Sequence, residues 1–253
     1  MRHNAARESM TAIVVIPARM RSTRLPGKPL ADIAGAPMIV HVWRRALAAG
    51  AGPVVVACAE DEIIRAIEAA GGRAVLTRAD HPSGSDRVFE AVETLDPERR
   101  HDVVVNLQGD LPLIEPAAIR AAVSALDDKE TDIATLAAVI DNDEDRRAES
   151  VVKVAAAFAP GARIARALYF SRLPVPWGDG PLYHHIGIYA YRREALARFV
   201  ALPESALERR ERLEQLRALE AGMRIAVALV DTVPLGVDTP ADLARVRALI
   251  ASP

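Results

Sequence analysis

Residues 12–30 read AIVVIPARMRSTRLPGKPL, and this stretch sets the expectation for the rest of the fold. Its apolar start, Ala12–Ile16, is typical of a strand buried on both faces of a parallel sheet. The polar loop that follows carries Arg19, Arg21, Ser22, Thr23, Arg24 and Lys28. Ligands of open α/β sheets bind just beyond the carboxyl ends of the strands. The loop is therefore placed to hold an anion that needs several cations and hydroxyls, such as a triphosphate.

This loop matches neither of the two best-known phosphate-binding motifs. The consensus G-x-x-x-x-G-K-[ST] is absent, and no G-x-G-x-x-G follows the first strand, which disfavours an NAD-dependent oxidoreductase. A solvated basic loop is the alternative interpretation. The position directly after a buried strand, with prolines that limit flexibility, favours a binding role.

Strand-like and helical patterns alternate through the first half of the chain. The expected strands are residues 12–16, 53–57, 74–77 and 103–107, and the expected helices are residues 37–49, 61–70, 86–95 and 116–126. Such βαβ succession predicts an α/β fold with a mostly parallel sheet covered by helices on both faces.

The alternation of strands and helices ends between about Thr131 and Tyr191, where strand-like runs follow one another with few helices between them. We expect strands at residues 133–139, 151–156 and 186–191, forming an inserted, partly antiparallel subregion that covers one side of a cleft. A charged helix over residues 205–221, a strand over residues 224–230 and a helix from Pro240 follow. Residues 11–253 are thus expected to form a single domain behind a disordered extension, residues 1–10.

Composition excludes several classes of protein. The net charge of the 253 residues is −2, so no global field draws the chain to nucleic acid. No apolar run approaches the roughly 18 residues needed to cross a bilayer, and the polar start MRHNAARESM has no signal-peptide core. The single cysteine, Cys58, lies in an apolar run and is expected to be a buried, inert thiol. We therefore expect a cytoplasmic protein without membrane insertion.

Two aspartates are candidates for a metal site. In VVVNLQGDLPLI, residues 103–114, Asp110 follows a buried strand, where a carboxylate suits a Mg²⁺ ion that also holds phosphate oxygens. A Gly-Asp turn that merely ends the strand is an equally good interpretation. In PLGVDTPADLARV, residues 234–246, Thr239 and Asp242 form an acidic variant of a capping box. That motif leaves Asp238 available as a second ligand, although a structural role is slightly favoured.

The motif HPSGSDRVFEAV, residues 81–92, combines a donor-rich turn with a helix start. Arg87 falls in the first helical turn, where a cation opposes the helix dipole unless an anion compensates, so it is a candidate ligand for an acidic substrate. The weaker candidates have ordinary structural explanations. Tyr189 is expected to pack in the core, His184 and His185 cannot easily share a metal, and Glu208, Glu211 and Glu214 are expected to form a solvated helix face.

Seven ordered segments resemble the 3-deoxy-manno-octulosonate (KDO) cytidylyltransferases, or CMP-KDO synthetases. They are IPARMRSTRLPGKPLADIAGAPMIVHV, ADHPSGSDR, VVNLQGD, ALYFSRLPVPW, HIGIYAYRREAL, LERRERLEQLRALEAG and GVDTPADL, and the likeness spans Ala12 to Ile250. The resemblance implies a Rossmann-like nucleotidyltransferase fold that is usually homodimeric, with the middle region contributing to the dimer contact. It also implies CTP and KDO as substrates, CMP-KDO for lipopolysaccharide biosynthesis and pyrophosphate as products, and Mg²⁺ as cofactor.

The resemblance assigns roles by position. The nucleotide would contact Ala18, Arg19, Ser22, Thr23, Arg24, Lys28, Ser83 and Gly84. The sugar acid would contact Arg87, Gln108, His185, Tyr189 and Glu214. Asp110 and Asp238 would hold Mg²⁺ and, with Arg24 and Lys28, carry the catalysis.

The sequence departs from the family pattern in a few places. Leu111 stands where an acidic residue is usual, His184 replaces an arginine, Ala206 replaces a proline, SGSDR replaces SGTER, and ACAED is less rich in aspartate. These changes bear on the choice of sugar acid, so an 8-amino KDO analogue or a nonulosonate is the alternative acceptor. A non-catalytic nucleotide sensor on the same scaffold is the alternative from another class.

Overall fold

The computed structural model describes residues 10–22 and 24–251. Residues 1–9, 23, 252 and 253 lie outside the described part. The expected disordered extension therefore falls almost wholly outside it and stays a prediction, as does any role of Thr23.

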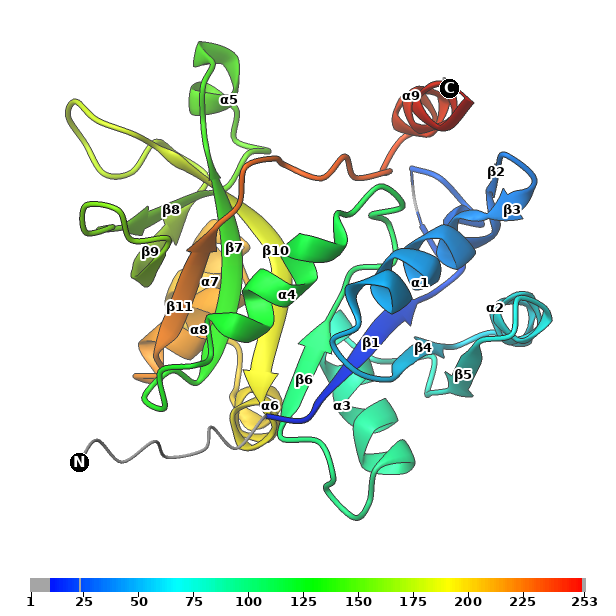
Figure 1. The fold of residues 1–253 in the computed structure, drawn as a ribbon. Coiled ribbons are helices and arrows are strands. Elements are labelled where there is room, and N and C mark those ends of the chain that lie inside the picture. The colour runs from blue at the N-terminus through cyan, green and yellow to red at the C-terminus, as the bar shows by residue number, and fades with distance from the viewer. Residues whose placement is uncertain (1–9, 23, 252–253) are drawn as a thin grey trace, which may run out of the picture.

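A single nine-stranded sheet organises the described chain (Figure 1). Its strands, in spatial order, are β5 (Arg73–Leu76), β4 (Val54–Cys58), β1 (Ala12–Ala18), β6 (Val103–Asn106), β10 (Tyr183–Arg192), β7 (Ile133–Val139), β11 (Ile225–Leu229), β9 (Ile164–Ser171) and β8 (Lys153–Ala156). The strands from β5 to β6 are all parallel, as βαβ connections require. These elements confirm the predicted Rossmann-like α/β fold.

The second half of the chain extends the same sheet instead of forming a separate layer. Strand β10 runs antiparallel between β6 and β7, while β7 and β11 are again parallel. Strands β9 and β8 complete the edge as an antiparallel pair. The partly antiparallel character was therefore predicted correctly, and the structure adds that β10 joins the two halves at the centre of the sheet.

Helices cover both faces of the sheet because its central strands are apolar on both sides. Along β1, Val14 and Ile16 face one core, whereas Ile13 and Val15 face the other. The first core lies under α1 (Met38–Ala49), α2 (Asp61–Ala69) and α4 (Pro116–Ser124). The second lies under α3 (Gly84–Leu95), α6 (Arg193–Ala201), α7 (Ala206–Glu211) and α8 (Gln215–Glu220).

The expected charged helix over residues 205–221 is wrong as a single element. It is two short helices, α7 and α8, because Arg212 adopts the left-handed conformation with φ 55° and ψ 47°. The sequence reasoning also missed β9, α6 and the short α5 (Asp143–Arg147). Strand β9 escaped notice because its outward positions include Arg166, which interrupts the apolar run.

A third, smaller core holds the C-terminal helix α9 (Pro240–Ala251) against the start of the chain. Ile33, from the short hairpin of β2 (Asp32–Ile33) and β3 (Ala36–Pro37), packs there with Met38, Val237, Leu243 and Val246. Figure 1 shows α9 far from β11 and beside the β2–β3 hairpin. This contact brings the segment before α9 next to the loop after β1, which includes the short 3₁₀ helix η1 (Lys28–Leu30). In the described part of the chain, every helix is too short or too polar to span a bilayer.

Candidate active site

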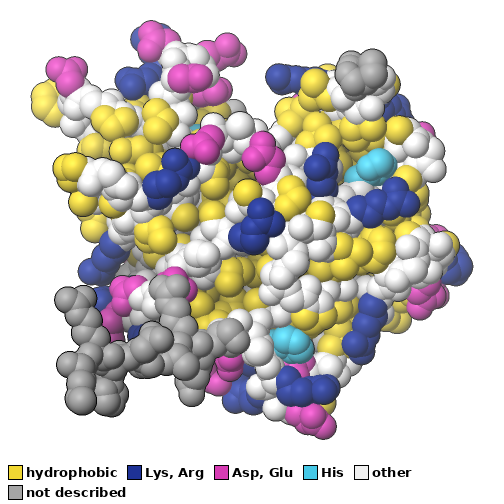
Figure 2. All heavy atoms as spheres, viewed as in Figure 1, with side chains coloured by type: hydrophobic (Ala, Val, Ile, Leu, Met, Phe, Trp, Pro, Cys, Tyr) yellow, Lys and Arg dark blue, Asp and Glu magenta, His cyan; other side chains and the backbone are white. Residues whose placement is uncertain are grey.

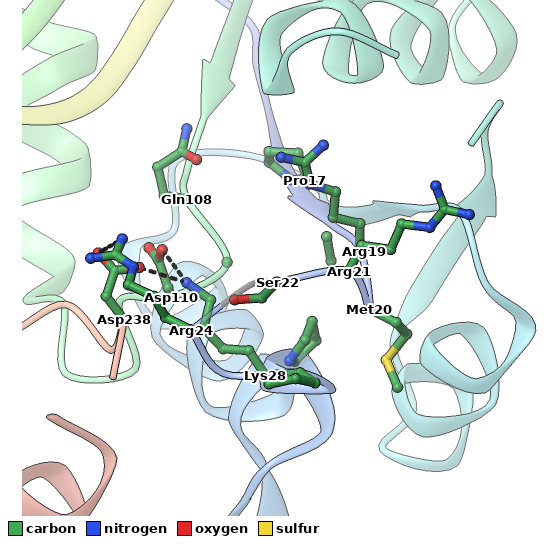
Figure 3. Close-up of a pocket in the computed structure, with 14 residues that line it drawn as sticks. Pro17, Arg19, Met20, Arg21, Ser22, Arg24, Lys28, Gln108, Asp110 and Asp238 are labelled. Carbon is green, nitrogen blue, oxygen red and sulfur yellow. Dashed lines mark hydrogen bonds and ion pairs between the residues drawn. The ribbon is translucent and has the colours of Figure 1, made fainter. Parts of the chain in front are cut away.

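A cavity of about 840 Å³ opens at the carboxyl ends of β1 and β6 (Figure 3). It is lined by Pro17, Ala18, Arg19, Met20, Arg21, Ser22, Arg24, Pro26, Lys28, Pro29, Gln108, Gly109, Asp110 and Asp238. Three segments supply these residues: the loop after β1, the loop after β6, and the segment before α9. This is the edge of the sheet at which open α/β folds bind ligands.

Two carboxylates and two cations meet at one end of this cavity. The Lys28 ammonium lies 2.8 Å from Asp110 Oδ2 and 3.1 Å from Asp238 Oδ1. Arg24 pairs with the other oxygen of Asp238 at 3.2 Å. Burial acts to lower the pKa of Lys28, but the charges and hydrogen bonds of the two aspartates outweigh it, so its pKa is raised. Figure 3 shows these four side chains together, with Arg19 and Arg21 on the opposite side of the cavity.

Backbone contacts fix the two aspartates. The backbone N–H of Val237 donates to the carbonyl of Asp110 at 2.9 Å, which ties the two segments together. Gly109 lets its loop approach β1 closely, because a Cβ there would lie 3.0 Å from the Pro17 carbonyl oxygen. The Asp242 carboxylate accepts from the backbone N–H of Thr239 at 2.8 Å and from that of Asp238 at 3.1 Å. The predicted acidic capping box is confirmed, and it orients Asp238 toward Lys28.

A smaller cavity of about 130 Å³ adjoins the first. Its lining is Pro17, Ala18, Arg19, His81, Ser83, Gly84, Arg87 and Gln108. Four of these residues, Pro17, Ala18, Arg19 and Gln108, also line the larger cavity, so the two are continuous. His81 was not singled out from the sequence, although it lies in the same turn as Ser83.

Arg87 is buried beside this smaller cavity, where the charges of Glu60 and Glu90 offset part of its own. Its side chain is 3% exposed and donates a hydrogen bond to the Thr77 hydroxyl. Among the described residues no carboxylate lies within ion-pair distance of Arg87, and burial lowers the pKa of its guanidinium. A buried cation is stabilised by an anion, so the expectation that Arg87 binds an acidic ligand stays a prediction.

The helix that carries Arg87 starts earlier than predicted. Helix α3 begins at Gly84, and the Ser83 hydroxyl caps it by accepting from the backbone N–H of Asp86 at 3.3 Å. The same hydroxyl donates to the Asp86 carboxylate at 2.7 Å. The cap holds the Ser83–Gly84 turn against the cavity shared with Arg19.

Known proteins resemble this chain over nearly its whole length. A sequence profile described as Cytidylyltransferase matches residues 13–225. A 3-deoxy-manno-octulosonate cytidylyltransferase of Paramagnetospirillum magneticum is 64% identical over 95% of this chain and 98% of its own length. One of the same name from Parvibaculum lavamentivorans is 67% identical over 94% of this chain and 92% of its own length. The chain belongs to the 3-deoxy-manno-octulosonate cytidylyltransferase family.

Solved structures agree with membership of this family. A structure described as CMP:2-keto-3-deoxy-manno-octonic acid synthetase complexed with CTP superposes with a TM-score of 0.88. It is 43% identical in sequence, over 95% of this chain and 98% of its own. A 4-diphosphocytidyl-2C-methyl-D-erythritol synthase from Anaerococcus prevotii shares only 12% identity, with a TM-score of 0.65 over 95% of this chain and 98% of its own, which shows the fold alone.

The cytidylyltransferase fold brings together most of the residues that the sequence singled out. The larger cavity contains Ala18, Arg19, Ser22, Arg24, Lys28, Gln108, Asp110 and Asp238, and the smaller one adds Ser83, Gly84 and Arg87. Leu111, one of the departures from the family pattern, is buried beneath the site and packs near Gly236.

Three residues expected near the sugar line neither of these two cavities. Strand β10 directs His185 and Tyr189 toward the second core, whereas Glu214 directly precedes α8. His185 is 8% exposed, and burial lowers its pKa to about 3. Its ring centroid lies 5.6 Å from that of Tyr189. Tyr189 packs against the second core, as predicted from its position in the strand. Glu214 accepts from the Ser85 hydroxyl at 3.1 Å and borders a third cavity of about 690 Å³. Ser83 lines both that cavity and the smaller one, so Glu214 is linked to the site through the start of α3.

The expectation that Glu208, Glu211 and Glu214 form a solvated face is wrong. Glu208 is buried, caps α7 through Ser205 and pairs with Arg217 at 2.5 Å. Glu211 accepts from the Tyr169 and Ser171 hydroxyls and from a backbone N–H. Burial raises the pKa of Glu214. The spacing S-x-x-E from Ser205 to Glu208 is a capping-box signal that would have predicted the first of these.

Proposed function

We propose that this chain transfers CMP from CTP to the anomeric hydroxyl of KDO, giving CMP-KDO and pyrophosphate. The observation that carries the proposal is the meeting of Asp110, Asp238, Lys28 and Arg24 at one end of a cavity large enough for a nucleotide. The names of relatives 64% and 67% identical over nearly the whole chain support the substrates.

The two connected cavities suit the two parts of CTP. The triphosphate would lie along the loop after β1, where the cations Arg19, Arg21, Arg24 and Lys28 are available. The base would enter the smaller cavity between Arg19 and the Ser83–Gly84 turn, which offers backbone and hydroxyl groups for hydrogen bonding. The similar structure described as complexed with CTP supports CTP as the nucleotide.

The donor set fits a magnesium ion. Both aspartates direct an oxygen at the same cation, the Lys28 ammonium, so they converge on one point. Mg²⁺ is commonly held by one or two carboxylates together with substrate phosphates and water. Among the described residues no cluster of three or more histidine, cysteine, aspartate or glutamate side chains placed to hold a metal occurs. When bound, the ion would lower the pKa of the attacking hydroxyl and offset phosphate charge.

The reaction we propose is a direct in-line displacement. The anomeric oxygen of KDO forms a bond to the α-phosphorus, the bond from that phosphorus to the bridging oxygen breaks, and pyrophosphate leaves with the electron pair. The hydroxyl proton is lost to water. Lys28 and Arg24 offset the charge that grows on the leaving group, and Asp110 and Asp238 would hold the magnesium ion beside the reacting groups. No covalent enzyme intermediate is needed.

A homodimer is part of the proposal. Large apolar side chains are exposed on the β9–β8 edge, on the loop that follows β9 and at the end of β7: Val139, Ile164, Leu168, Leu173 and Trp177, the last 99% exposed. Figure 2 shows hydrophobic side chains gathered over this upper-left part of the molecule. An apolar patch of this kind favours burial against a second copy. Light scattering during gel filtration would measure the mass directly; a monomer at micromolar concentration would refute the dimer. A cytoplasmic location remains a prediction.

Release of pyrophosphate from defined substrate pairs tests the activity. CTP with KDO should release it, while CTP with an 8-amino analogue or a nonulosonate in competition reports the acceptor preference. No release with any pair would favour the nucleotide-sensor alternative.

An Asp110→Ala variant isolates the metal role. It should fold, because Asp110 is partly exposed and its backbone contacts remain, yet lose turnover at every magnesium concentration. Substantial residual activity would refute a metal role for Asp110.

A further inference from the structure

An irregularity in the centre of the sheet surrounds Thr135. Strand β10 pairs with β7 through Ile186 opposite Leu136 and Ala190 opposite Ala134, so residues 187–189 bulge opposite Thr135 alone. Thr135 is completely buried, and its backbone stays in register with β11 on the other side. Its side chain therefore fills the bulge.

The Thr135 hydroxyl makes three polar contacts. Its oxygen lies 2.9 Å from the carbonyl oxygen of Ile188, 3.1 Å from that of Ile186, and 3.0 Å from Nε2 of His185. Carbonyl oxygens only accept, so the single hydroxyl proton is directed at the nearer carbonyl, that of Ile188, and is not available to His185. The hydroxyl oxygen must then accept from His185, which requires the proton of the imidazole to be on Nε2.

The other ring nitrogen of His185 is left as an acceptor. Burial, with a smaller contribution from His184, lowers the pKa of His185 to about 3, so the ring is neutral at neutral pH. A neutral ring with its proton on Nε2 carries a lone pair on Nδ1. Within residues 10–22 and 24–251, no group hydrogen-bonds to that Nδ1, and the atom is not among the fully buried side-chain nitrogens and oxygens that lack a partner. The Phe170 ring, edge-on at 4.8 Å, and the Tyr189 ring fix the orientation.

His185 is connected to the larger cavity through its neighbours. Tyr189 pairs with Asn106 across the β10–β6 ladder, and Asn106 accepts a hydrogen bond from Gln108 at 3.1 Å. Gln108 lines both connected cavities. The sugar acid expected beside Gln108 and Tyr189 carries several hydroxyls, each of which donates one proton.

We propose that Thr135 is a positioning residue that fixes His185 as the Nε2–H tautomer, so that Nδ1 accepts a hydrogen bond from a hydroxyl of the sugar acid. The inference rests on the proposed function for the identity of the acceptor. Thr135, which lines neither of the two connected cavities, would thereby determine whether Nδ1 of His185 accepts or donates a hydrogen bond. The opposite tautomer would present an N–H to the same hydroxyl and orient it differently.

The tautomer is measured without any mutation. In the full chain labelled with ¹⁵N, long-range correlation spectra of the imidazoles distinguish protonated from unprotonated nitrogens, and a His185→Phe variant identifies the signals of His185. We expect an unprotonated Nδ1 and a protonated Nε2 throughout the neutral range. A protonated Nδ1, alone or in an imidazolium, would overturn the proposal even if every Thr135 variant failed to fold.

Variants of Thr135 test the link to the substrate. Thr135→Val removes the hydroxyl at constant shape and should give a mixture of tautomers and a KM for KDO raised about tenfold, with the KM for CTP unchanged. Thr135→Ser keeps the hydroxyl and should retain both the spectrum and the KM. A Thr135→Val enzyme with the wild-type tautomer and KM would overturn the proposal. An unchanged KM for KDO in the His185→Phe variant would refute the contact between His185 and the sugar. The tautomer of His185 is tested separately, by the ¹⁵N spectrum of the unmutated protein.

Discussion

Replacement of Lys28 by Met should strengthen metal binding in the absence of nucleotide. The Lys28 ammonium donates hydrogen bonds to one oxygen of Asp110, at 2.8 Å, and to one oxygen of Asp238, at 3.1 Å. A magnesium ion needs oxygens at about 2.0–2.1 Å, so the ion and the ammonium cannot share them. In the wild type, metal binding must therefore displace Lys28, which then becomes available to the phosphates.

The size of the effect follows from the exposure of the two pairs. The Asp110 side chain is 30% exposed and that of Asp238 is 51% exposed, so solvent screens both contacts. We assign about 1 kcal/mol to the first and about 0.5 kcal/mol to the second. Removal of the ammonium should therefore raise metal affinity about tenfold.

Electron paramagnetic resonance of free Mn²⁺, titrated with the protein alone, measures this affinity. Lys28→Met should bind Mn²⁺ more tightly than wild type, whereas the control Lys129→Met, at an exposed lysine, should not differ from it. The same Lys28→Met enzyme should lose most of its turnover, because the phosphates lose a cation. Equal or weaker Mn²⁺ binding by Lys28→Met would refute the competition between ammonium and metal.

Two further predictions concern stability. Arg212→Gly should raise the free energy of unfolding by about 0.5–1 kcal/mol, since φ 55° strains any residue with a Cβ; an unchanged urea midpoint would show that the strain is negligible. Asp96→Asn should lower it by about 3 kcal/mol at neutral pH, because Asp96 is a buried partner of Arg193 at 2.5 Å. Burial opposes ionisation of Asp96, but hydrogen bonds from Arg100, His101 and Arg193 lower its pKa below the usual range. The ionised form therefore stabilises the fold above about pH 4, and the difference from Asp96→Asn should shrink as the pH falls below that value, in urea unfolding across pH.

The parts of the site that were predicted correctly from the sequence depend on local patterns. The apolar run Ala12–Ile16 indicated a buried strand, which is confirmed, and it placed the cations of the following loop at the edge of the sheet where the larger cavity lies. Binding of an anion by this loop stays a prediction. The Thr239–Asp242 capping box was visible from spacing alone. By contrast, the Arg212 break was missed because a left-handed arginine leaves no mark in the charge pattern of residues 205–221.

The sequence by itself determined that Ala12–Ile16 is a buried strand followed by a loop rich in cations, and it predicted an anion site there. The resemblance supplied the pairing of Asp110 with Asp238. Only the tertiary structure decided what those carboxylates meet. Lys28 contacts aspartates 82 and 210 positions away, because β6 lies beside β1 and α9 packs on the β2–β3 hairpin. It likewise decided that His185 is neutral and buried, because β10 inserts between β6 and β7 and turns that side chain toward the core. Periodicity and capping act between neighbours in the chain, whereas the order of strands in a sheet is fixed by how distant apolar faces pack together.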